Sequence, residues 1–337
     1  MPIQASAPCR VDLAGGTLDI WPLCHLLEAP AVTVNLALSL RAHAYVVARY
    51  DGKVEIVSED QGQRIVLDAA DLRHDRLPLA TRLVEWLGPG EGLSLTLRSE
   101  VPQGSGLGGS SALAIACAGA LAALHRRAWT PEQLRTGVQN VETSVLQTPT
   151  GYQDYVPALH GGVNVITATP ARIEVEPVPG GHELFRGRLL LVDTGVPHHS
   201  GLTNWEVVRR FIDRDAQVRD ALEQIAGAAA QMRDAVRAGD MAGVAQALDR
   251  EWKERRRLAP EVSTPQIERI EAAARAAGAT GAKICGAGGG GCLAILIEPD
   301  RRAAVEQAVV TAGGQLQPFE PDADGLLVEE GGDRPAA

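Results

Sequence analysis

A glycine- and serine-rich segment, VPQGSGLGGSSALAIACAGALAALH at residues 101–125, stands directly before a stretch of small apolar residues typical of a helix. Backbone N–H groups at such a bend, together with the helix dipole, attract an anion, and glycine lets a phosphate approach the backbone closely. The hydroxyl groups of Ser110 and Ser111 can cap the helix or reach a phosphate or Mg²⁺. The segment therefore predicts a phosphate site, and the alternative is a tight turn in front of a buried helix.

Neither common phosphate-binding fingerprint accounts for this segment. The Walker sequence requires a lysine after its last glycine, and here serine follows Gly109. The dinucleotide fingerprint opens the first βαβ unit of a fold, and the chain has no early βαβ repeat. A phosphate site at residues 104–111 would therefore be of another type.

A second glycine run, KICGAGGGGC at residues 283–292, leads straight into the apolar strand sequence LAILI. Four successive glycines carry a large ordering entropy, which makes them a poor connection unless two segments, or a segment and a ligand, must come close together. The run predicts such a close approach, and the alternative is a flexible loop.

The elements that must position these residues form two halves. Alternating or β-branched sequences predict strands at 41–50, 53–59, 63–69, 93–101, 159–166, 171–178, 187–195, 293–297 and 325–330. Helices are predicted at 79–87, 112–126, 130–146 and 300–312, with several more between 204 and 276. We expect an α+β fold with a first domain at residues 1–185 and a second at 186–332.

Composition limits the class of protein. The 337 residues carry a formal net charge of −10, which disfavours a nucleic-acid partner, and 45% are hydrophobic, enough for a sizeable core. The five cysteines are odd in number and form no C-x-x-C, so neither disulfides nor a zinc site are indicated. No apolar run suggests a membrane span, and the first residues do not resemble a secretory signal. We expect a cytoplasmic monomer or homodimer.

Three motifs, in the same order and at the expected spacing, resemble those of the GHMP kinase superfamily (galactokinase, homoserine kinase, mevalonate kinase and relatives). They are APCRVDLAGGTLD at residues 7–19, the loop at residues 102–112 that resembles P-x-x-x-G-L-G-S-S-A, and the glycine run at 283–292. The resemblance covers about residues 5–330. It implies an N-terminal ATP-binding domain like domain 2 of ribosomal protein S5 and a ferredoxin-like α/β C-terminal domain.

Two further segments resemble the sugar kinase branch, which includes kinases for D-glycero-D-manno-heptose 7-phosphate and L-fucose. TGYQDY at 150–155, followed by HGG at 160–162, is similar to the G-x-Q-D-Q…GG segment of that branch, and WKERRRLAP at 252–260 resembles it too. The resemblance implies transfer of a phosphoryl group from ATP, with Mg²⁺, to a sugar or sugar phosphate, at the anomeric hydroxyl. A kinase of another small alcohol or acid, and a silent protein that senses nucleotide or sugar, remain as alternatives.

The resemblance also assigns roles to single residues. Asp154 would be the base that accepts the proton of the acceptor hydroxyl, and Arg10 would stabilise the charge of the transferring group. Ser110 and Glu142 would hold Mg²⁺, with Ser111 as the alternative serine. The residues expected to bind the phosphates of ATP are Gly104, Gly106, Leu107, Gly108, Gly109, Ser110 and Ser111. Those expected to contact the acceptor are Gly15, Gly16, Asp19, Gln153, Thr194, Gly288 and Gly289.

The chain departs from the family pattern in two places. Gly109 stands where the family commonly has a serine, and Leu18 precedes Asp19 in a motif that commonly ends in G-T-D or H-T-D. Outside these motifs, His198 and His199 would either contact a substrate phosphate or be solvated. Lys283 would either bond a substrate oxygen or pack its aliphatic stem.

Overall fold

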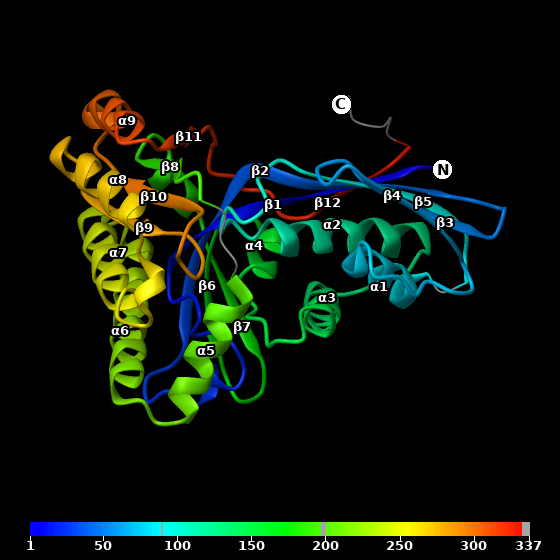
Figure 1. Ribbon diagram of the computed structural model, residues 1–337, viewed down its shortest axis with the longest axis horizontal. Helices are drawn as coiled ribbons and strands as arrows, with labels where there is room; N and C mark the ends of the chain where they lie inside the picture. Colours follow the sequence, from blue (N-terminus) through cyan, green and yellow to red (C-terminus); the bar gives the residue numbers. More distant parts are fainter. Residues whose placement is uncertain (89, 197–199, 332–337) are drawn as a thin grey trace.

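The computed structural model describes residues 1–88, 90–196 and 200–331, with only the backbone described for residues 200–203 (Figure 1). Its strands form two sheets, one with the order β12-β1-β2-β5-β3-β4 to which β6 and β7 are attached through β2, and one with the order β11-β8-β10-β9. The α+β fold expected from the sequence is confirmed.

The bounds of the elements follow the predicted pattern in most places. The strands are β1 (Ile3–Ala14), β2 (Val32–Ala48), β3 (Lys53–Ser58), β4 (Gln63–Asp68), β5 (Leu93–Ser99), β6 (Val163–Ala168), β7 (Ile173–Val178), β8 (Leu189–Asp193), β9 (Gly281–Ile284), β10 (Cys292–Leu296), β11 (Gln315–Gln317) and β12 (Leu327–Glu330). The helices are α1 (Pro78–Leu87), α2 (Gly109–Leu124), α3 (Pro131–Leu146), α4 (Tyr155–His160), α5 (Ser200–Ile212), α6 (Ala216–Ala238), α7 (Met241–Arg255), α8 (Pro265–Ala276) and α9 (Arg302–Thr311).

Several predicted boundaries were wrong. Strand β2 begins at Val32 rather than at residue 41, and β1, β9 and β11 are not among the predicted strands. Helix α2 begins at Gly109 rather than at residue 112, so both serines of the loop lie in its first turn. The segment predicted as one strand at 159–166 begins with the end of α4, and β6 starts only at Val163. The two glycines between them, Gly161 and Gly162, have positive φ, which breaks the helix and separates it from the strand.

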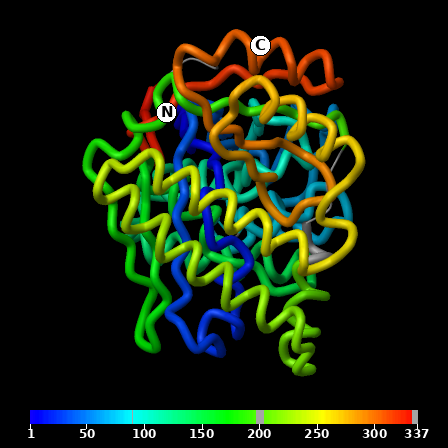
Figure 2. Tube along the Cα trace, turned by 90° about the vertical axis from the view of Figure 1, so that its left-hand side faces the viewer, coloured from blue at the N-terminus to red at the C-terminus, as the bar shows by residue number. Residues whose placement is uncertain are grey.

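Strand β1 carries the first motif and is buried at every position from Ala7 onward. Helix α2 packs against β1 and β2, and α6 and α7 also contact β1. Figure 2 shows α6 and α7 running side by side in front of the first strands. The pairing of β1 with β2 shifts register between Pro8 and Arg10 and again between Asp12 and Ala14. Such irregularities re-aim side chains, and here they flank two buried charged residues.

The chain crosses from the first sheet to the second between β7 and β8 and returns at its end, where β12 pairs antiparallel with β1. The domain boundary at residue 185 stays a prediction, and the final strand lies in the sheet of the first half. Among the described residues, no helix combines the length and apolar character needed to cross a membrane.

Candidate functional site

The bend before α2 has the backbone geometry of an anion site. Gly104, Gly106 and Gly108 have φ values of 76°, 74° and 72°, a left-handed region that glycine occupies without strain. Gly108 is the N-cap of α2, and no side chain caps the first turn. The first N–H groups of a helix have no partner within the helix, so these amides and the positive end of the helix dipole are left for a ligand.

The two glycine runs lie against each other. The N–H of Cys292 donates to the carbonyl oxygen of Ser105 at 2.8 Å. A Cβ atom at Gly106 would lie 2.4 Å from the carbonyl oxygen of Cys285, and one at Gly291 would lie 2.6 Å from that of Ser105. The close approach predicted for the second run is confirmed, because only glycine fits at these contacts.

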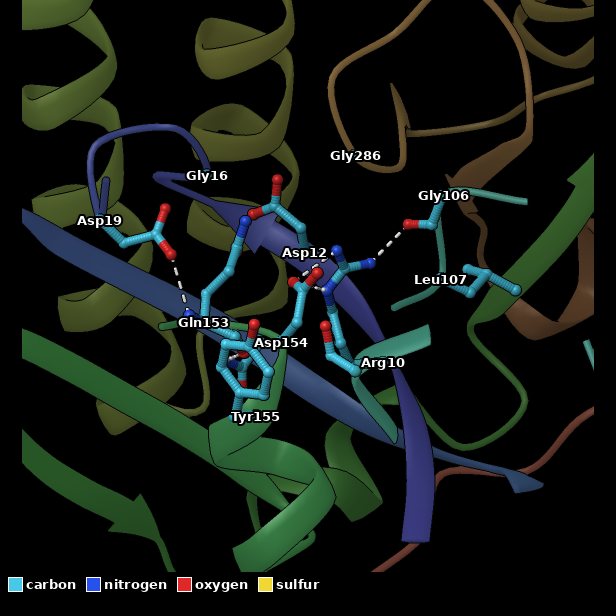
Figure 3. A network of polar contacts seen from close by, with 12 residues as sticks. Arg10, Asp12, Gly16, Asp19, Gly106, Leu107, Gln153, Asp154, Tyr155 and Gly286 are labelled. Carbon is cyan, nitrogen blue, oxygen red and sulfur yellow. Dashed lines mark hydrogen bonds and ion pairs between the residues drawn. The ribbon is translucent and has the colours of Figure 1, made fainter. Parts of the chain in front are cut away.

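Arg10 joins strand β1, the bend and the start of α4. Its Nε donates to Oδ1 of Asp154 at 2.8 Å, and its Nη2 lies 2.6 Å from the same oxygen (Figure 3). Its Nη1 donates to the carbonyl oxygen of Gly106, and its backbone N–H donates to that of Leu107 at 2.9 Å. Arg10 is buried, and although burial opposes its charge, Asp154 and Asp12 raise the pKa of the guanidinium. The guanidinium therefore stays charged, and it lies directly beside the bend.

Asp154 is the less buried member of this pair. Its side chain is 29% exposed, and it precedes α4 without capping that helix. A Cβ atom on Gly108 would lie 3.5 Å from its carboxyl carbon. The carboxylate is thus held by Arg10 beside the bend and remains partly accessible.

Glu142, on α3, meets the first turn of α2. Its Oε1 accepts from the hydroxyl of Ser110 at 2.7 Å, and its Oε2 accepts from Ser111 at 3.0 Å and from Tyr155 at 2.6 Å. Burial raises the pKa of Glu142, and these three hydroxyl bonds oppose the shift. The described residues contain no cluster of three or more His, Cys, Asp or Glu. One carboxylate beside an exposed serine nevertheless fits Mg²⁺, which takes its remaining ligands from phosphate oxygens and water.

The turn that follows β1 places Asp19 next to the segment before α4. Oδ2 of Asp19 accepts from the backbone N–H of Gln153 at 2.9 Å (Figure 3). Burial raises the pKa of Asp19 to about 7. A Cβ atom at Gly16 would lie 2.4 Å from Oδ2 of Asp12 and 2.8 Å from Nε2 of Gln153, so this turn requires glycine. Oε1 of Gln153 is buried and has no hydrogen-bond partner among the described residues.

Three residues expected to contact the acceptor, Thr194, Gly288 and Gly289, lie at the second glycine run instead of the turn after β1. The N–H of Thr194 donates to the carbonyl oxygen of Gly291 at 3.0 Å, which ties β8 to the second glycine run. Gly288 and Gly289 pack against Val262, the latter through an N–H···O bond of 2.9 Å. A direct contact of these three residues with an acceptor stays a prediction. His198 and His199 lie outside the described residues.

Lys283 forms an internal ion pair, which neither of the two alternatives given for it included. Its ammonium group donates to the backbone and carboxylate oxygens of Asp12 at 2.8 and 2.6 Å, and its side chain is fully buried. It therefore belongs to an internal ion pair.

Four polar residues that the motifs did not single out also belong to the site: Tyr155, Asp12, Glu251 and Arg255. Tyr155 follows the Gln-Asp pair directly, and Asp12 lies inside the first motif. A buried carboxylate such as that of Asp12 needs a buried partner. The partners themselves come from α7 and β9, and no spacing in the sequence connects them to β1.

A separate cleft of about 690 Å³ lies between the start of α3 and strands β6 and β7. Its charged side chains are largely paired: Arg135 with Glu132, Arg172 with Glu174, and Glu176 with Arg237. None of the predicted site residues lines it. The convergence of the motifs, rather than the volume of this hollow, therefore locates the candidate site.

Comparison with known proteins finds GHMP kinase family models in both halves of the chain and kinases among its relatives. The family model described as GHMP kinases N terminal domain matches residues 74–162, and the one described as GHMP kinases C terminal matches residues 232–315. D-glycero-alpha-D-manno-heptose 7-phosphate kinase of Campylobacter jejuni is 26% identical over 96% of this chain and 98% of that protein. Mevalonate kinase of Thermococcus gammatolerans is 30% identical over 98% of this chain and 99% of that protein.

Solved structures agree with the fold. The structure of a D-glycero-D-manno-heptose 1-phosphate kinase from Bacteroides thetaiotaomicron has a TM-score of 0.79 and 20% sequence identity, and the match covers 97% of this chain and 99% of that one. At 20% sequence identity the similarity shows the fold alone, so the ligands of this chain have to be inferred from the residues of the candidate site.

Proposed function

Because this chain belongs to the GHMP kinase family, we propose that it transfers the γ-phosphoryl group of ATP to a hydroxyl group of a sugar or sugar phosphate. The observation that carries the proposal is the Arg10–Asp154 pair, with its 2.6 Å contact at the bend before α2. A base and a cation are thereby held where a phosphoryl group and a hydroxyl group would meet.

The donor side follows from the bend. The amides of residues 104–111 that have no partner within the chain bind the phosphates of ATP, and the dipole of α2 favours their negative charge. Ser110 and Glu142 hold Mg²⁺, which when bound neutralises part of the charge of the triphosphate. Arg10 donates to the transferring group, because its planar guanidinium can bond two phosphate oxygens at once.

The acceptor side follows from the turn after β1. Asp19 and the amide of Gln153 bond the hydroxyl groups of the acceptor, and the glycines of the turn let a sugar ring lie against the backbone. Asp154 accepts the proton of the attacking hydroxyl, which moves from that oxygen to the carboxylate while the phosphoryl group transfers in line. Little covalent chemistry is required, so positioning supplies most of the rate enhancement.

The names of two relatives point to different acceptors for this chain. The heptose 7-phosphate kinase relative supports a sugar phosphate as the acceptor. The anomeric hydroxyl is inferred from the resemblance of the Gln153-Asp154 segment to the sugar kinase branch. The mevalonate kinase relative supports a small non-sugar alcohol as the second candidate.

The proposal is tested by measuring ADP release from ATP and Mg²⁺ over a panel of hexoses, L-fucose, heptose phosphates and mevalonate. Turnover with a sugar supports the first candidate, and turnover with mevalonate alone supports the second. Binding of ATP without ADP release from any acceptor would identify a silent binding protein.

Replacing the base sharpens this test. Asp154→Asn should lower kcat by about 100-fold or more while ATP affinity stays nearly intact, because the amide cannot accept the proton. The matched control is Asp68→Asn, at an exposed carboxylate on β4 that pairs with Lys53. Turnover of Asp154→Asn near that of the control would remove the base from the scheme.

A further inference from the structure

We propose that Arg255, at the end of α7, is a positioning residue that fixes the acceptor turn, residues 15–19, and through it the acceptor-binding carboxylate of Asp19. The inference rests on the proposed function only in taking this turn as the acceptor site. The contacts that hold the turn are independent of which acceptor binds.

The acceptor turn is strained. Thr17 has a φ of 78°, in the left-handed region that β-branched residues avoid. Gly15 has a φ of 88°, and a Cβ atom there would lie 2.1 Å from the carbonyl oxygen of Val32. Within the turn, Leu18 N–H donates to Gly15 and Ile20 N–H donates to Thr17, at 3.1 and 3.2 Å. A residue in such a conformation persists only where surrounding contacts hold it.

Arg255 supplies these contacts from the other half of the chain. Its Nη2 donates to the carbonyl oxygen of Gly16 at 2.8 Å, and its Nη1 donates to Oγ1 of Thr17 at 3.3 Å. The hydroxyl of Thr17 in turn donates to Oδ1 of Asn204, on α5, at 3.2 Å. This one guanidinium thus bonds both the backbone of Gly16 and the side chain of Thr17. Both residues lie within three positions of Asp19.

A buried ion cluster fixes the guanidinium itself. The Nε of Arg255 donates to Oε1 of Glu251 at 2.9 Å, and its Nη2 lies 3.7 Å from Oδ2 of Asp12. Lys283 bonds Asp12 and lies 3.7 Å from Glu251. The side chains of Asp12, Glu251 and Lys283 are fully buried, and that of Arg255 is 1% exposed. Two carboxylates and two cations balance one another in charge.

Stability alone does not account for this cluster. A buried ion pair is often no more stabilising than apolar side chains of the same volume, because both ions lose their hydration. Here Oδ1 of Asp12 and Oε2 of Glu251 are buried without a hydrogen-bond partner among the described residues, which adds to that cost. The cluster does, however, join β1, α7 and β9 at fixed separations, and its one guanidinium reaches the turn.

The position of Lys283 extends the connection. It lies in β9, which leads into the second glycine run, and Nη1 of Arg255 lies 3.5 Å from the carbonyl oxygen of Gly286 in that run. The same run packs on the bend before α2. Arg255 therefore contacts both the acceptor turn and the loop that supports the donor bend, and it sets the separation between them.

The test compares Arg255→Met with Arg257→Met. Arg257 lies two residues further on, bonds Glu254 and Asp220 at the surface, and has a side chain that is 39% exposed. Amide hydrogen exchange of the protein without ligand is measured first. In Arg255→Met the amides of Leu18 and Ile20 should exchange at least ~10-fold faster, equivalent to a tenfold change in the opening equilibrium, while those of α2 and the whole control variant stay unchanged.

Kinetics with ATP and the acceptor panel provide the second measurement. Arg255→Met should raise the KM of the acceptor at least ~10-fold and leave the KM of ATP within ~2-fold, a split that general destabilisation would not produce. Unchanged exchange at Leu18 and Ile20, or equal rises in both KM values, would overturn the proposal. If no acceptor is turned over even by the unmodified protein, the proposed function fails and the exchange result still decides the role of Arg255.

Two further variants guard against misfolding and probe the strain. Glu251→Met/Arg255→Met removes one charge of each sign and leaves the Asp12–Lys283 pair intact, so it should fold and show the same faster exchange. Thr17→Gly accepts positive φ without strain. In that background, adding Arg255→Met should change acceptor KM less than it does alone, and full additivity would show that Arg255 does not act through Thr17.

Discussion

Helices α2 and α3 have the same length of 16 residues but begin in opposite ways. Helix α3 starts with a complete capping box, in which the Thr130 side chain accepts from the N–H of Gln133 and the Gln133 side chain accepts from the N–H of Thr130. An acidic residue, Glu132, lies in its first turn. Helix α2 has Gly108 as its N-cap, with neither a capping side chain nor an acidic residue in its first turn.

Under the proposed function, the difference separates a structural helix start from one that binds the phosphates of ATP. Capping hydrogen bonds and an acidic residue satisfy the free amides and the dipole of α3 within the chain. At α2 the same groups are left exposed to whatever anion enters the bend. The body of α3 then contributes Glu142 to the first turn of α2, so the capped helix positions a carboxylate at the uncapped one.

The largest expected effect comes from closing the uncapped start. Gly108→Val should lower ATP affinity at least ~100-fold, about 2.7 kcal/mol, because valine disfavours the φ of 72° and a side chain covers the amides. Gly52→Val is the matched control: its φ is 69°, and a Cβ atom there meets nothing within 4 Å. Calorimetric titration with ATP distinguishes them, and equal affinities would mean that the bend serves packing only.

Removing the carboxylate that α3 presents should have the next largest effect. Glu142→Gln should weaken Mg²⁺ binding about 100-fold, and Tyr155→Phe, which removes one of its three hydroxyl partners, about 10-fold. Since burial raises the pKa of Glu142, Mg²⁺ affinity of the unmodified protein should begin to fall on acidification at a higher pH than for an exposed glutamate. Metal titrations in the presence of ATP at several pH values measure both. The same acid-side fall in Glu142→Gln would exclude this carboxylate as its cause.

Asp19 is the carboxylate of the proposed acceptor site, and it lies at the start of neither α2 nor α3. Its pKa of about 7 means that it gains its charge as the pH rises from 6 to 8, and the charged form accepts two hydroxyl bonds. Acceptor KM should therefore fall several-fold, up to ~10-fold, over this range and be pH-independent in Asp19→Asn. The free energy of unfolding depends on pH in the opposite sense, because it falls as the pH rises through the raised pKa of Asp19. Asp19→Asn should therefore melt at a higher temperature than the unmodified protein at pH 8. A pH-independent KM in the unmodified protein would contradict the role of Asp19.

The smallest effect is expected at the capped start. Thr130→Ala should lower the free energy of unfolding by about 1 kcal/mol and leave ATP affinity unchanged, because it removes one capping bond at a helix end that binds no ligand. Denaturant unfolding and ATP titration measure the two quantities. A loss of ATP affinity here would break the distinction between the two helices.

Local chemistry explains which parts of the site the sequence predicted. The helix start at Thr130, the glycine bend and the Gln153-Asp154 segment depend on neighbouring residues, and they occur in the structure as elements or contacts. The start of α2 was misplaced because Gly109 and the two serines favour loops, whereas burial against β1 and β2 extends the helix over them.

Contacts between segments far apart in the chain could not be predicted from the sequence. Arg255 reaches Gly16 across 239 positions and Lys283 reaches Asp12 across 271, and no periodicity relates such pairs. The return of β12 to β1 was missed for the same reason. Tyr155 follows Asp154 directly, and only the fold shows that its hydroxyl bonds Glu142.

The most direct measurement is a crystal structure with Mg²⁺ and a non-hydrolysable ATP analogue. The account predicts that the β- and γ-phosphates accept hydrogen bonds from the amides between Gly106 and Ser111, with the metal between them and the side chains of Ser110 and Glu142. A triphosphate bound elsewhere, for instance in the cleft beside the capped start of α3, would contradict it.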